Sequence, residues 1–510
     1  MISRINSAVL NGLDVVATEV EVGFSRGIPG IVIVGLPDNA VKESRERLKL
    51  AVGQSNFDYP QATKIVINLS PADVRKEGSA LDLPMAVGII KNRYHLESPA
   101  FSDLLFYGEL NLNGDLNPVK GVLNISLFAR KNGFRGIVIP FANRAEAAFV
   151  SGIEVYALKH LAEVIDLVEN PAHFVPFKGQ TMGGAEADCE NNFSEIKGQH
   201  LAKRVMEIAA AGFHHALMIG PPGSGKSMIS KALPSILPDM SDDEVLETSL
   251  TYSAAGLLGE KGGLVRQRPF RSPHHTISDV GISGGGKYPL PGEISLAHNG
   301  VLFLDEIPYF KKSALEVLRQ PLEDGKITVS RSLTSSTFPA RFMLIAAMNP
   351  CQDSAGMGDG GFAACSAAQR RHYYDKLSKP LLDRIDLQIE VKKVKLEEIT
   401  STATAESSAA IKKRVVGART IQLLRFQGLK KKIFANGQMK NPEIKKFCPL
   451  DDEGGRLLRL AVDRFDLSAR GYFKVLKVAR TIADLEGAEP ISARHVQEAL
   501  QYRSLDLSRF

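Results

Sequence analysis

A chain of 510 residues is too long to pack around one hydrophobic core, so its length predicts two or three domains. Its 44% hydrophobic and 24% charged residues are typical of a globular protein, and no apolar stretch is long enough to cross a bilayer, which excludes a membrane-spanning protein. The net charge of +6 permits an anionic partner without requiring one. Because the amino terminus lacks signal-peptide features and the four cysteines are too scattered for a disulfide framework, we expect a cytoplasmic protein.

The first section of the chain alternates short β-rich runs with helical ones. Residues 30–37 (GIVIVGLP) and 64–71 (KIVINLSP) are examples of the β-rich runs. This pattern predicts a compact α/β or α+β domain over residues 1–175. Residues 176–197 are polar, contain glycine and lack periodicity, as is typical of a linker.

Residues 198–390 follow a different pattern, in which strands and helices alternate. Three runs are almost uniformly apolar, as buried parallel strands are, and they occupy residues 215–220, 301–307 and 342–349. Residues 391–510 are predicted to be helical. The clearest helix there lies in ARGYFKVLKVARTIADLEG, with Ser468 available as its N-cap and Gly487 just beyond its end.

The octapeptide GPPGSGKS directly follows one predicted strand and precedes a helical stretch. It fits the pattern G-x-x-x-x-G-K-[ST], in which backbone amides of the loop wrap phosphates. Lys226 would meet the β- and γ-phosphate oxygens of ATP, and Ser227 would coordinate Mg²⁺. The residues predicted to bind the nucleotide and its metal are Gly220, Pro221, Pro222, Gly223, Ser224, Gly225, Lys226, Ser227 and Asp305.

The run VLFLDE ends in two carboxylates. Its apolar residues predict a buried strand that delivers Asp305 to the Mg²⁺ shell, and Glu306 is then placed to polarise the attacking water. An acidic strand end alone is most often a surface terminus. Together with the phosphate-binding loop, it predicts a nucleoside triphosphatase.

Three further polar residues follow these motifs. Asn349 ends an apolar run, where its amide would hold the lytic water against the γ-phosphate; a strand-terminal cap before Pro350 is the alternative. Arg384 lies among apolar neighbours, and Arg470 begins the long carboxyl-terminal helix. An isolated arginine is usually solvated or salt-bridged, but the order of these parts is that of a ring ATPase.

Several motifs together resemble the ComM/YifB family, in the Mg-chelatase-like branch of the AAA+ ATPases, over nearly the full length. They are GPPGSGKS, FRSPHHTIS, GEISLAHNGVLFLDE, AAMNPC, PLLDRIDL and SARGYFKVLKVARTIADLEG. The resemblance implies that Asn349 is sensor 1, Arg384 is an arginine finger that enters a neighbour's site, and Arg470 is sensor 2. A site completed by a neighbour implies a ring, and we expect a hexamer.

The same resemblance implies the fold of the whole chain. It predicts a P-loop AAA+ core with a parallel sheet over residues 198–390, a helical lid over 391–510 and an amino-terminal α+β domain of the ribosomal-S5 domain-2-like fold over 1–175, with 176–197 as the linker. The stretches KEGSALDLPMAV and GELNLNGDLNPVKGVL resemble the carboxyl-terminal domain of Lon-type proteases, which shares that last fold.

In those stretches the serine and the lysine do not fall at the positions of the Lon catalytic dyad. Alignment with the Lon pattern puts Ala80 at the nucleophile position, with Ser79 one residue early, and places the base position near Leu123, with Lys120 displaced. A Ser–Lys dyad needs hydrogen-bond reach, and a shift of one residue on a strand turns a side chain to the opposite face. We therefore expect a binding or ring-organising role for this domain, and no proteolysis.

Two loops are candidates for contact with DNA. In this branch the segment before the acidic strand projects into the ring channel; its glycines 284–286 predict a loop outside any sheet, and Lys287 would contact a phosphate backbone. The stretch GKITVSRSLTSSTFPARF predicts a hairpin, with Lys326 and Arg331 as contacts. A solvated loop without a ligand is the alternative for each. The same choice stays open for the basic residues of the lid, which are Lys412, Lys413, Arg414, Lys430, Lys431, Lys432, Lys445 and Lys446.

A structural zinc site stays an open alternative that the cysteine pattern supports only weakly. Relatives often carry several cysteines after the sensor 1 strand, but here Cys351 and Cys365 remain alone, and zinc would need ligands such as Asp353 or His372. The pair His274 and His275 would contact nucleotide or Mg²⁺, or else pack and cap.

The sequence therefore predicts an ATP-hydrolysing ring motor that acts on single-stranded or branched DNA. The resemblance implies a helicase or branch-migration translocase in homologous recombination or natural transformation. The alternative is a Mg-chelatase-like or chaperone-type ATPase that remodels a protein partner. No contact with a membrane is expected.

Overall fold

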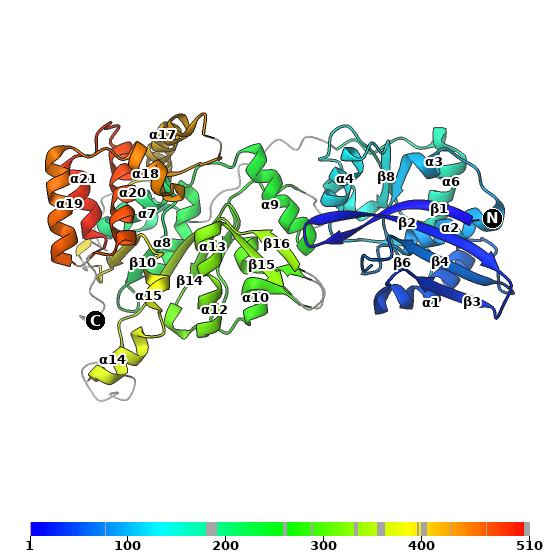
Figure 1. Ribbon diagram of the computed structural model, residues 1–510, viewed down its shortest axis with the longest axis horizontal. Helices are drawn as coiled ribbons and strands as arrows, with labels where there is room; N and C mark the ends of the chain where they lie inside the picture. The colour runs from blue at the N-terminus through cyan, green and yellow to red at the C-terminus, as the bar shows by residue number, and fades with distance from the viewer. Residues whose placement is uncertain are drawn as a thin grey trace.

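The computed structural model describes residues 2–503 except Glu77, Lys430, residue 466 and the segments 180–190, 259–262, 287–288, 331–334, 354–362, 395–396 and 399–404. Three parts follow one another along the long axis of the molecule, with the amino-terminal part at one end, a central sheet flanked by helices, and a helical part at the other end (Figure 1). The predicted order of an α+β part, a parallel-sheet core and a helical carboxyl-terminal part is confirmed.

The amino-terminal part contains a four-stranded sheet, a three-stranded parallel sheet and a small hairpin. In sheet order, the strands are β1 (Ile2–Asn11), β2 (Asp14–Ser25), β4 (Lys64–Ser70) and β3 (Gly30–Val34); then β5 (Leu104–Phe106), β8 (Gly136–Pro140) and β9 (Glu154–Leu158); and finally β6 (Glu109–Leu110) with β7 (Leu116–Asn117). The helices are α1 (Asn39–Gln54), α2 (Asp82–Tyr94), α3 (Ala100–Asp103), α4 (Val122–Lys131), α5 (Arg144–Ala147) and α6 (Leu161–Glu169).

Helix α2 is the central element of this part because it is apolar on nearly all sides. Its residues from Leu83 to Ile90 are all buried, and it packs against β1, β2 and α1. Helix α1 instead buries one stripe, which includes Val41, Leu48 and Val52, and its N-cap Asp38 accepts a hydrogen bond of 2.8 Å from the Val41 amide.

The central part is built on a five-stranded sheet in which every pair of strands is parallel. Its order is β11 (Phe270–Arg271), β14 (Val301–Leu304), β17 (Met343–Met348), β10 (Ala216–Ile219) and β20 (Leu387–Glu390). The three predicted apolar runs form β10, β14 and β17. Successive residues of these strands face opposite sides of the sheet and enter two separate hydrophobic clusters.

Helices cover both faces of this sheet, and three short hairpins extend from it. The helices are α7 (His200–Gly212), α8 (Lys226–Ala232), α9 (Asp242–Ala255), α10 (Asp279–Ser283), α11 (Glu293–Leu296), α12 (Lys312–Val317), α13 (Arg319–Asp324), α14 (Ala367–Tyr374) and α15 (Lys379–Leu382). The hairpins are β12 (Gly284–Gly285) with β13 (Leu290–Pro291), β15 (Lys326–Ser330) with β16 (Ser335–Pro339), and β18 (Gln352–Asp353) with β19 (Ala363–Ala364).

The helical part shares a hydrophobic core with the sheet. It consists of α17 (Ser408–Phe426), α18 (Asn441–Phe447), α19 (Asp452–Phe465), α20 (Ala469–Leu485) and α21 (Ala493–Gln501). The helix predicted most clearly is α20, in which Ser468 caps the amide of Gly471 at 3.1 Å and Gly487 adopts a φ of 68° beyond the end, as expected. Val475 and Ile482 of α20 belong to the same buried cluster as Met218 of β10, so the lid is packed against the core.

The amino-terminal part also contacts the core directly. The amide of Gly121 donates a hydrogen bond of 3.0 Å to the carbonyl of Ser253 in α9, and the Ser253 hydroxyl donates to the buried carboxylate of Glu146. Helices α4 and α9 pack against each other, and Leu13 at the β1–β2 turn packs into the hydrophobic cluster of the core. The two parts are thus joined by packing as well as by the chain.

His215 links the first strand of the core to its neighbours. Its Nδ1 accepts a hydrogen bond of 3.1 Å from the Leu344 amide, and its own amide donates to Asp386 at 3.1 Å. Burial lowers the pKa of His215 to about 4, so the folded protein prefers the neutral ring.

This depressed pKa predicts a stability change in acid. A group whose pKa is lower in the folded state than its unfolded value of about 6.5 contributes stability above pH 6.5 that is lost as the pH falls toward 4. We expect the loss due to His215 to be about 2 kcal/mol, discounted because the side chain is only partly buried. His215→Asn keeps an acceptor but does not titrate, so urea unfolding followed by circular dichroism should show a smaller decrease between pH 6.5 and pH 4.5. An unchanged pH dependence would contradict the assignment.

Candidate nucleotide-binding site

The predicted phosphate-binding loop joins β10 to α8. Gly223 and Gly225 have φ values of 75° and 91°, and a Cβ added to either would meet no atom within 4 Å, so the loop is open on that side. Gly220 has the opposite environment, because a Cβ there would lie 2.1 Å from the Val391 carbonyl oxygen. The loop is therefore anchored at its start and offers open space at the two glycines that precede α8.

Lys226 lies inside this loop. Its Nζ donates to the carbonyl oxygens of Gly220 at 2.7 Å and Pro221 at 3.0 Å, and to Oδ1 of Asn349 at 3.1 Å. Burial lowers the pKa of Lys226, and the nearby Asp305 and Glu306 carboxylates oppose that shift. The ammonium group is thus held beside the tip of β17, where it can bind a phosphate.

Ser227 and Asp305 come together from separate elements. The Ser227 hydroxyl on α8 donates a hydrogen bond of 2.7 Å to Oδ2 of Asp305, which directly follows β14. Because β10, β17 and β14 are adjacent and parallel, their carboxyl ends meet at one edge of the sheet. A hydroxyl and a carboxylate are oxygen ligands of the kind that Mg²⁺ prefers, so this pair fits the predicted metal.

Glu306 is exposed beside this pair. Its φ of 52° lies in the left-handed region, which is uncommon for a residue other than glycine and occurs at functional sites. Its amide donates to Oδ1 of Asp305 at 3.0 Å. The turn therefore directs the two successive carboxylates to different positions.

Asn349 completes the cluster at this edge of the sheet. It directly follows β17, the strand between β14 and β10, and its Oδ1 accepts from Lys226 while its carbonyl oxygen accepts a hydrogen bond of 3.0 Å from the Tyr373 hydroxyl. The structure thus brings together Lys226, Ser227, Asp305 and Asn349 as the sequence predicted.

Arg384 lies at the opposite edge of the sheet. The register pairs Ala216 with Leu387 and Ile219 with Glu390, so the phosphate-binding loop follows the end of one strand while Arg384 precedes the start of its parallel neighbour. Four residues of strand separate the two edges by about 13 Å. Arg384 is 8% exposed, and it donates to the Pro380 carbonyl at 2.6 Å and to Glu323 at 2.5 Å.

Arg470 lies beside Arg384 and not beside the loop. It forms an ion pair of 3.1 Å with Oε1 of Glu323, the same oxygen that Arg384 contacts. One turn further along α20, Nζ of Lys474 donates to Asp386 at 2.6 Å, which fixes this helix next to the start of β20. The two predicted arginines therefore form one cluster around Glu323.

A cavity of about 1030 Å³ opens at this second edge, between the core and the lid. It is lined by basic side chains on both sides, which are Lys326, Arg341, Arg384, Lys431, Lys432, Lys440, Arg470, Lys474 and Lys477. Acidic residues such as Glu247, Glu323 and Asp386 also line it. The cavity therefore places basic side chains of the core and of the lid opposite each other, at the edge of the sheet that does not carry the phosphate-binding loop.

The candidate DNA contacts are only partly described. Lys287 and Arg331 lie outside the described residues. Lys326 pairs with Pro339 at the base of the β15–β16 hairpin and lines the cavity of the arginines, so it does not lie at the hairpin tip. The prediction that glycines 284–286 lie outside any sheet is wrong, because Gly284 and Gly285 pair with Pro291 and Leu290 in the β12–β13 hairpin, where the glycines tolerate φ values of 87° and 128°.

Several basic residues of the lid are tied to carboxylates. Lys412 contacts Asp239 at 2.7 Å, Lys432 contacts Asp243 at 3.0 Å, and Arg414 contacts both Glu207 and Glu406. Lys430 lies outside the described residues. These contacts favour a structural role for part of the basic lid surface.

The two histidines of FRSPHHTIS belong to an aromatic cluster. Their ring centroids are 4.1 Å apart, and the His275 ring lies 6.0 Å from that of Tyr309, which follows the acidic strand. His274 also accepts from the amide of Thr276 at 3.4 Å, as a capping residue does. Packing and capping thus account for both side chains.

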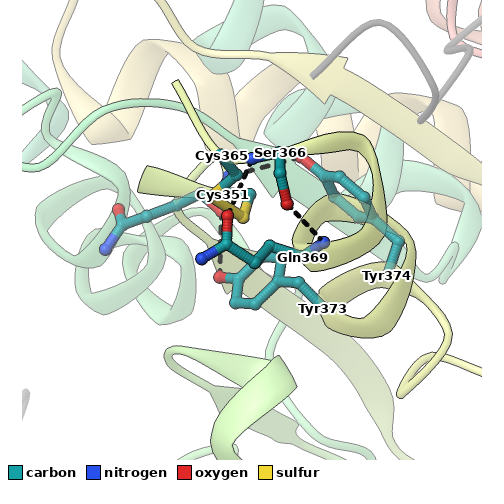
Figure 2. The surroundings of a disulfide bond; sticks show 7 residues. Cys351, Cys365, Ser366, Gln369, Tyr373 and Tyr374 are labelled. Atoms are coloured by element: carbon teal, nitrogen blue, oxygen red, sulfur yellow. Dashed lines mark hydrogen bonds between the residues drawn. A yellow bond between two sulfur atoms is a disulfide. The ribbon is translucent and has the colours of Figure 1, made fainter. Parts of the chain in front are cut away.

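Cys351 and Cys365 form a disulfide, with an S–S distance of 2.09 Å (Figure 2). The prediction that the cysteines are too scattered to form disulfides is therefore wrong for these two. The reason is the β18–β19 hairpin, which pairs Gln352 with Ala364 and so places the preceding and following cysteines opposite each other. Among the described residues no group of three or more histidines, cysteines or acids could hold a metal ion.

The residues of the displaced protease dyad have other partners. The Ser79 hydroxyl donates to Glu109, and the side chain of Lys120 lies against Gly256 of the core. The carbonyl of Lys120 accepts from the Tyr107 hydroxyl at 3.0 Å.

Sequence reasoning missed Glu323 and Tyr373. Glu323 is one acid in a short polar helix, and Tyr373 is followed by another tyrosine in a stretch without a motif. The sequence marks these two residues only by their position in the chain. Glu323 precedes the predicted hairpin, and Tyr373 lies between Asn349 and Arg384.

The fold and the site define a class: a P-loop AAA+ protein of the Mg-chelatase type. The family model for magnesium chelatase subunit ChlI matches residues 192–399, a model for subunit ChlI of Mg-chelatase matches 20–143, and the ChlI carboxyl-terminal model matches 405–503. Together they cover all three parts of the chain.

Similarity over the full length gives the particular family. The chain is 39% identical over 506 residues to the uncharacterized protein YifB of Escherichia coli, covering 99% of this chain and 97% of YifB. It is 39% identical over 500 residues to the competence protein ComM of Haemophilus influenzae, covering 97% and 96%. It is 24% identical over 330 residues to the magnesium-chelatase 38 kDa subunit of Cereibacter sphaeroides, covering 60% and 88%. The chain belongs to the ComM/YifB family of Mg-chelatase-like AAA+ proteins, as its motifs predicted.

None of the described helices has the length and the apolar character that a membrane crossing needs.

The Ser227–Asp305 pair predicts how Mg²⁺ dependence responds to substitution. Ser227→Ala removes the hydroxyl that contacts Asp305, so we expect the Mg²⁺ concentration for half-maximal ATP hydrolysis to rise about tenfold. Ser227→Thr retains a hydroxyl and is the matched control. A Mg²⁺ titration that is the same for Ser227→Ala and the unmodified protein would show that this residue is not a ligand.

Proposed function

We propose that the protein hydrolyses ATP within a ring of identical subunits and uses the released energy to move DNA. The observation that carries this proposal is the division of the polar residues between the two edges of the core sheet. Lys226, Asp305 and Asn349 lie at one edge, and Arg384 and Arg470 lie at the other. An arginine at the second edge can reach a nucleotide only if that nucleotide belongs to another subunit.

At the first edge, each residue has a distinct role in the proposed reaction. Lys226 offsets the charge of the β- and γ-phosphates, and Ser227 and Asp305 would hold Mg²⁺. Bound Mg²⁺ supplies positive charge that stabilises the transferring phosphoryl group. Glu306 accepts a proton from the attacking water, and the amide of Asn349 orients that water toward the γ-phosphorus.

At the second edge, Arg384 and Arg470 would complete the neighbour's site. In the chain alone both guanidinium groups are held by Glu323, which keeps them close together and limits their rotamers. When a neighbour's γ-phosphate enters the cavity, its negative charge can replace that of Glu323. An arginine supplied in this way typically increases hydrolysis by several orders of magnitude. We propose a hexamer as the ring that forms these contacts.

DNA is the proposed substrate of the motor. The similarity to a competence protein over nearly the whole chain supports an action on single-stranded or branched DNA, such as helicase activity or branch migration in recombination or natural transformation. Lys287 and Arg331 are proposed phosphate contacts in the channel, and Lys326 is proposed to act at the arginine cavity instead. A cytoplasmic location is part of this proposal.

A second candidate function is remodelling of a protein partner. Its support is the similarity to the magnesium-chelatase 38 kDa subunit, which covers 60% of this chain at 24% identity. The similarity to ComM is higher and covers 97% of the chain, so it favours the DNA motor.

The ATPase proposal predicts two different defects. Lys226→Ala should weaken ATP binding and abolish hydrolysis, because the phosphate charge is left unpaired. Glu306→Gln should retain ATP binding but lower kcat by about 10²-fold or more, since the amide cannot accept the proton of water. Hydrolysis of radiolabelled ATP and binding of a fluorescent ATP analogue measure the two effects. Full hydrolysis by Glu306→Gln would rule out Glu306 as the acceptor of the proton from water.

The DNA proposal is tested with a synthetic four-way junction. The unmodified protein should move the junction in the presence of ATP, and DNA should stimulate hydrolysis less as salt increases, because the contacts are mainly to phosphates. Lys287→Ala should hydrolyse ATP normally but fail to move the junction. Hydrolysis that ignores DNA and requires a protein partner would instead support the remodelling function.

A further inference from the structure

Helix α14 returns the chain to the candidate catalytic site. The chain leaves β17 at Asn349 and comes back at the end of α14, where the Tyr373 hydroxyl donates a hydrogen bond of 3.0 Å to the Asn349 carbonyl oxygen. The neighbouring Tyr374 hydroxyl accepts a hydrogen bond of 3.4 Å from the amide of Cys351. The carboxyl-terminal end of α14 is therefore attached to the segment that carries Asn349.

The other end of α14 is attached to the same segment by the disulfide. Cys365 is 5% exposed and directly precedes Ser366, the N-cap of α14. The Ser366 hydroxyl accepts from the amide of Gln369 at 3.2 Å, and the side chain of Gln369 accepts from the amide of Ser366 at 2.8 Å (Figure 2). The disulfide thus connects the start of a capped helix to Cys351, two residues after Asn349.

Tyr373 also lies close to Glu306, the proposed general base. Its ring centroid is 6.3 Å from that of Tyr309 in an edge-to-face arrangement, and the amide of Tyr309 donates to the carbonyl of Glu306 at 2.9 Å. Burial raises the pKa of Tyr373, and the Glu306 carboxylate adds to that shift, so the phenol keeps its proton at neutral pH and remains a donor. One side chain therefore contacts the backbone of Asn349 and packs beside the turn that carries Glu306.

We propose that Tyr373 is a positioning residue for the ATP hydrolysis proposed above, and that the Cys351–Cys365 disulfide holds it in place through α14. The inference rests on the proposed function. Tyr373 fixes the backbone carbonyl of Asn349 and thereby the orientation of the Asn349 side-chain amide, which faces Lys226. A small displacement of this amide affects the attacking water more than it affects ATP binding, because the phosphate contacts are made by the separate loop.

The disulfide makes this arrangement sensitive to dithiols. Reduction by a dithiol transfers two electrons to the S–S bond, which breaks to give two cysteine thiols, while the dithiol loses two electrons and two protons and becomes a cyclic disulfide. Without the covalent link, the pairing of β18 with β19 still joins the start of α14 to the segment that contains Cys351, but this pairing spans only two residues of each strand. The Tyr373–Asn349 hydrogen bond is then expected to form for a smaller fraction of the time.

The test separates kcat from KM in single variants. Tyr373→Phe removes only the hydroxyl, so we expect kcat for ATP hydrolysis to fall about fivefold and KM for ATP to change less than twofold. His372→Ala is the matched control, because His372 is an exposed residue of the same helix. Binding of a fluorescent ATP analogue shows whether each variant retains its folded site. A wild-type kcat for Tyr373→Phe would overturn the inference.

The role of the disulfide is tested by a double-mutant cycle. Cys351→Ser should lower kcat in the otherwise unmodified chain but cause little further loss in Tyr373→Phe, because both act through the same hydrogen bond. A dithiol should reproduce the effect of Cys351→Ser, with thiol titration used to confirm reduction. Additive losses, or an unchanged kcat after complete reduction, would contradict the proposed link. If the unmodified chain itself hydrolyses no ATP in any assembly state, the proposed function fails, which is a different result from an active chain that is indifferent to Tyr373.

Discussion

The direction of the five parallel strands determines at which edge of the core sheet the residues next to its strand ends lie. Parallel strands present all of their carboxyl ends at one edge, so the loop after β10, Asp305 after β14 and Asn349 after β17 converge there. The same rule places Arg384, which precedes β20, at the other edge. A single chain therefore carries candidate site residues at both edges, and the ring of subunits that we propose would join the two groups.

The packing of the lid keeps the second half together. Lys474 of α20 contacts Asp386 at the start of β20, and His214 contacts both Asp386 at 3.4 Å and Thr481 of α20 at 2.8 Å. Because this polar cluster is buried, a break in it would leave uncompensated charges, which is costly. Core and lid thus behave as one unit at this point, and Arg470 stays beside Arg384. In the proposed function, a change in the neighbour's nucleotide would act on both arginines at once.

The sequence predicted the residues whose position follows directly from a strand and a short motif. Asp305 and Asn349 are of this kind, because each immediately follows a recognisable apolar strand, and Lys226 and Ser227 belong to the motif that follows another such strand. Glu323 and Tyr373 could not be predicted, since their roles arise from contacts between segments that are distant in the chain. The disulfide was missed because each strand of the β18–β19 hairpin, Gln352–Asp353 and Ala363–Ala364, has only two residues. Strands this short have no alternating pattern from which their register could be predicted.

The central claim is that one subunit binds the nucleotide and its neighbour supplies the arginine. Mixing Lys226→Ala subunits with Arg384→Ala subunits tests it directly, because each variant retains the half that the other lacks. If the site is shared, a random equal mixture of the two inactive proteins should recover about a quarter of wild-type ATP hydrolysis. About a quarter of the interfaces in such a mixture pair an intact loop with an intact arginine. Full hydrolysis by Arg384→Ala alone, or no recovery in mixed rings whose assembly is verified, would contradict the account.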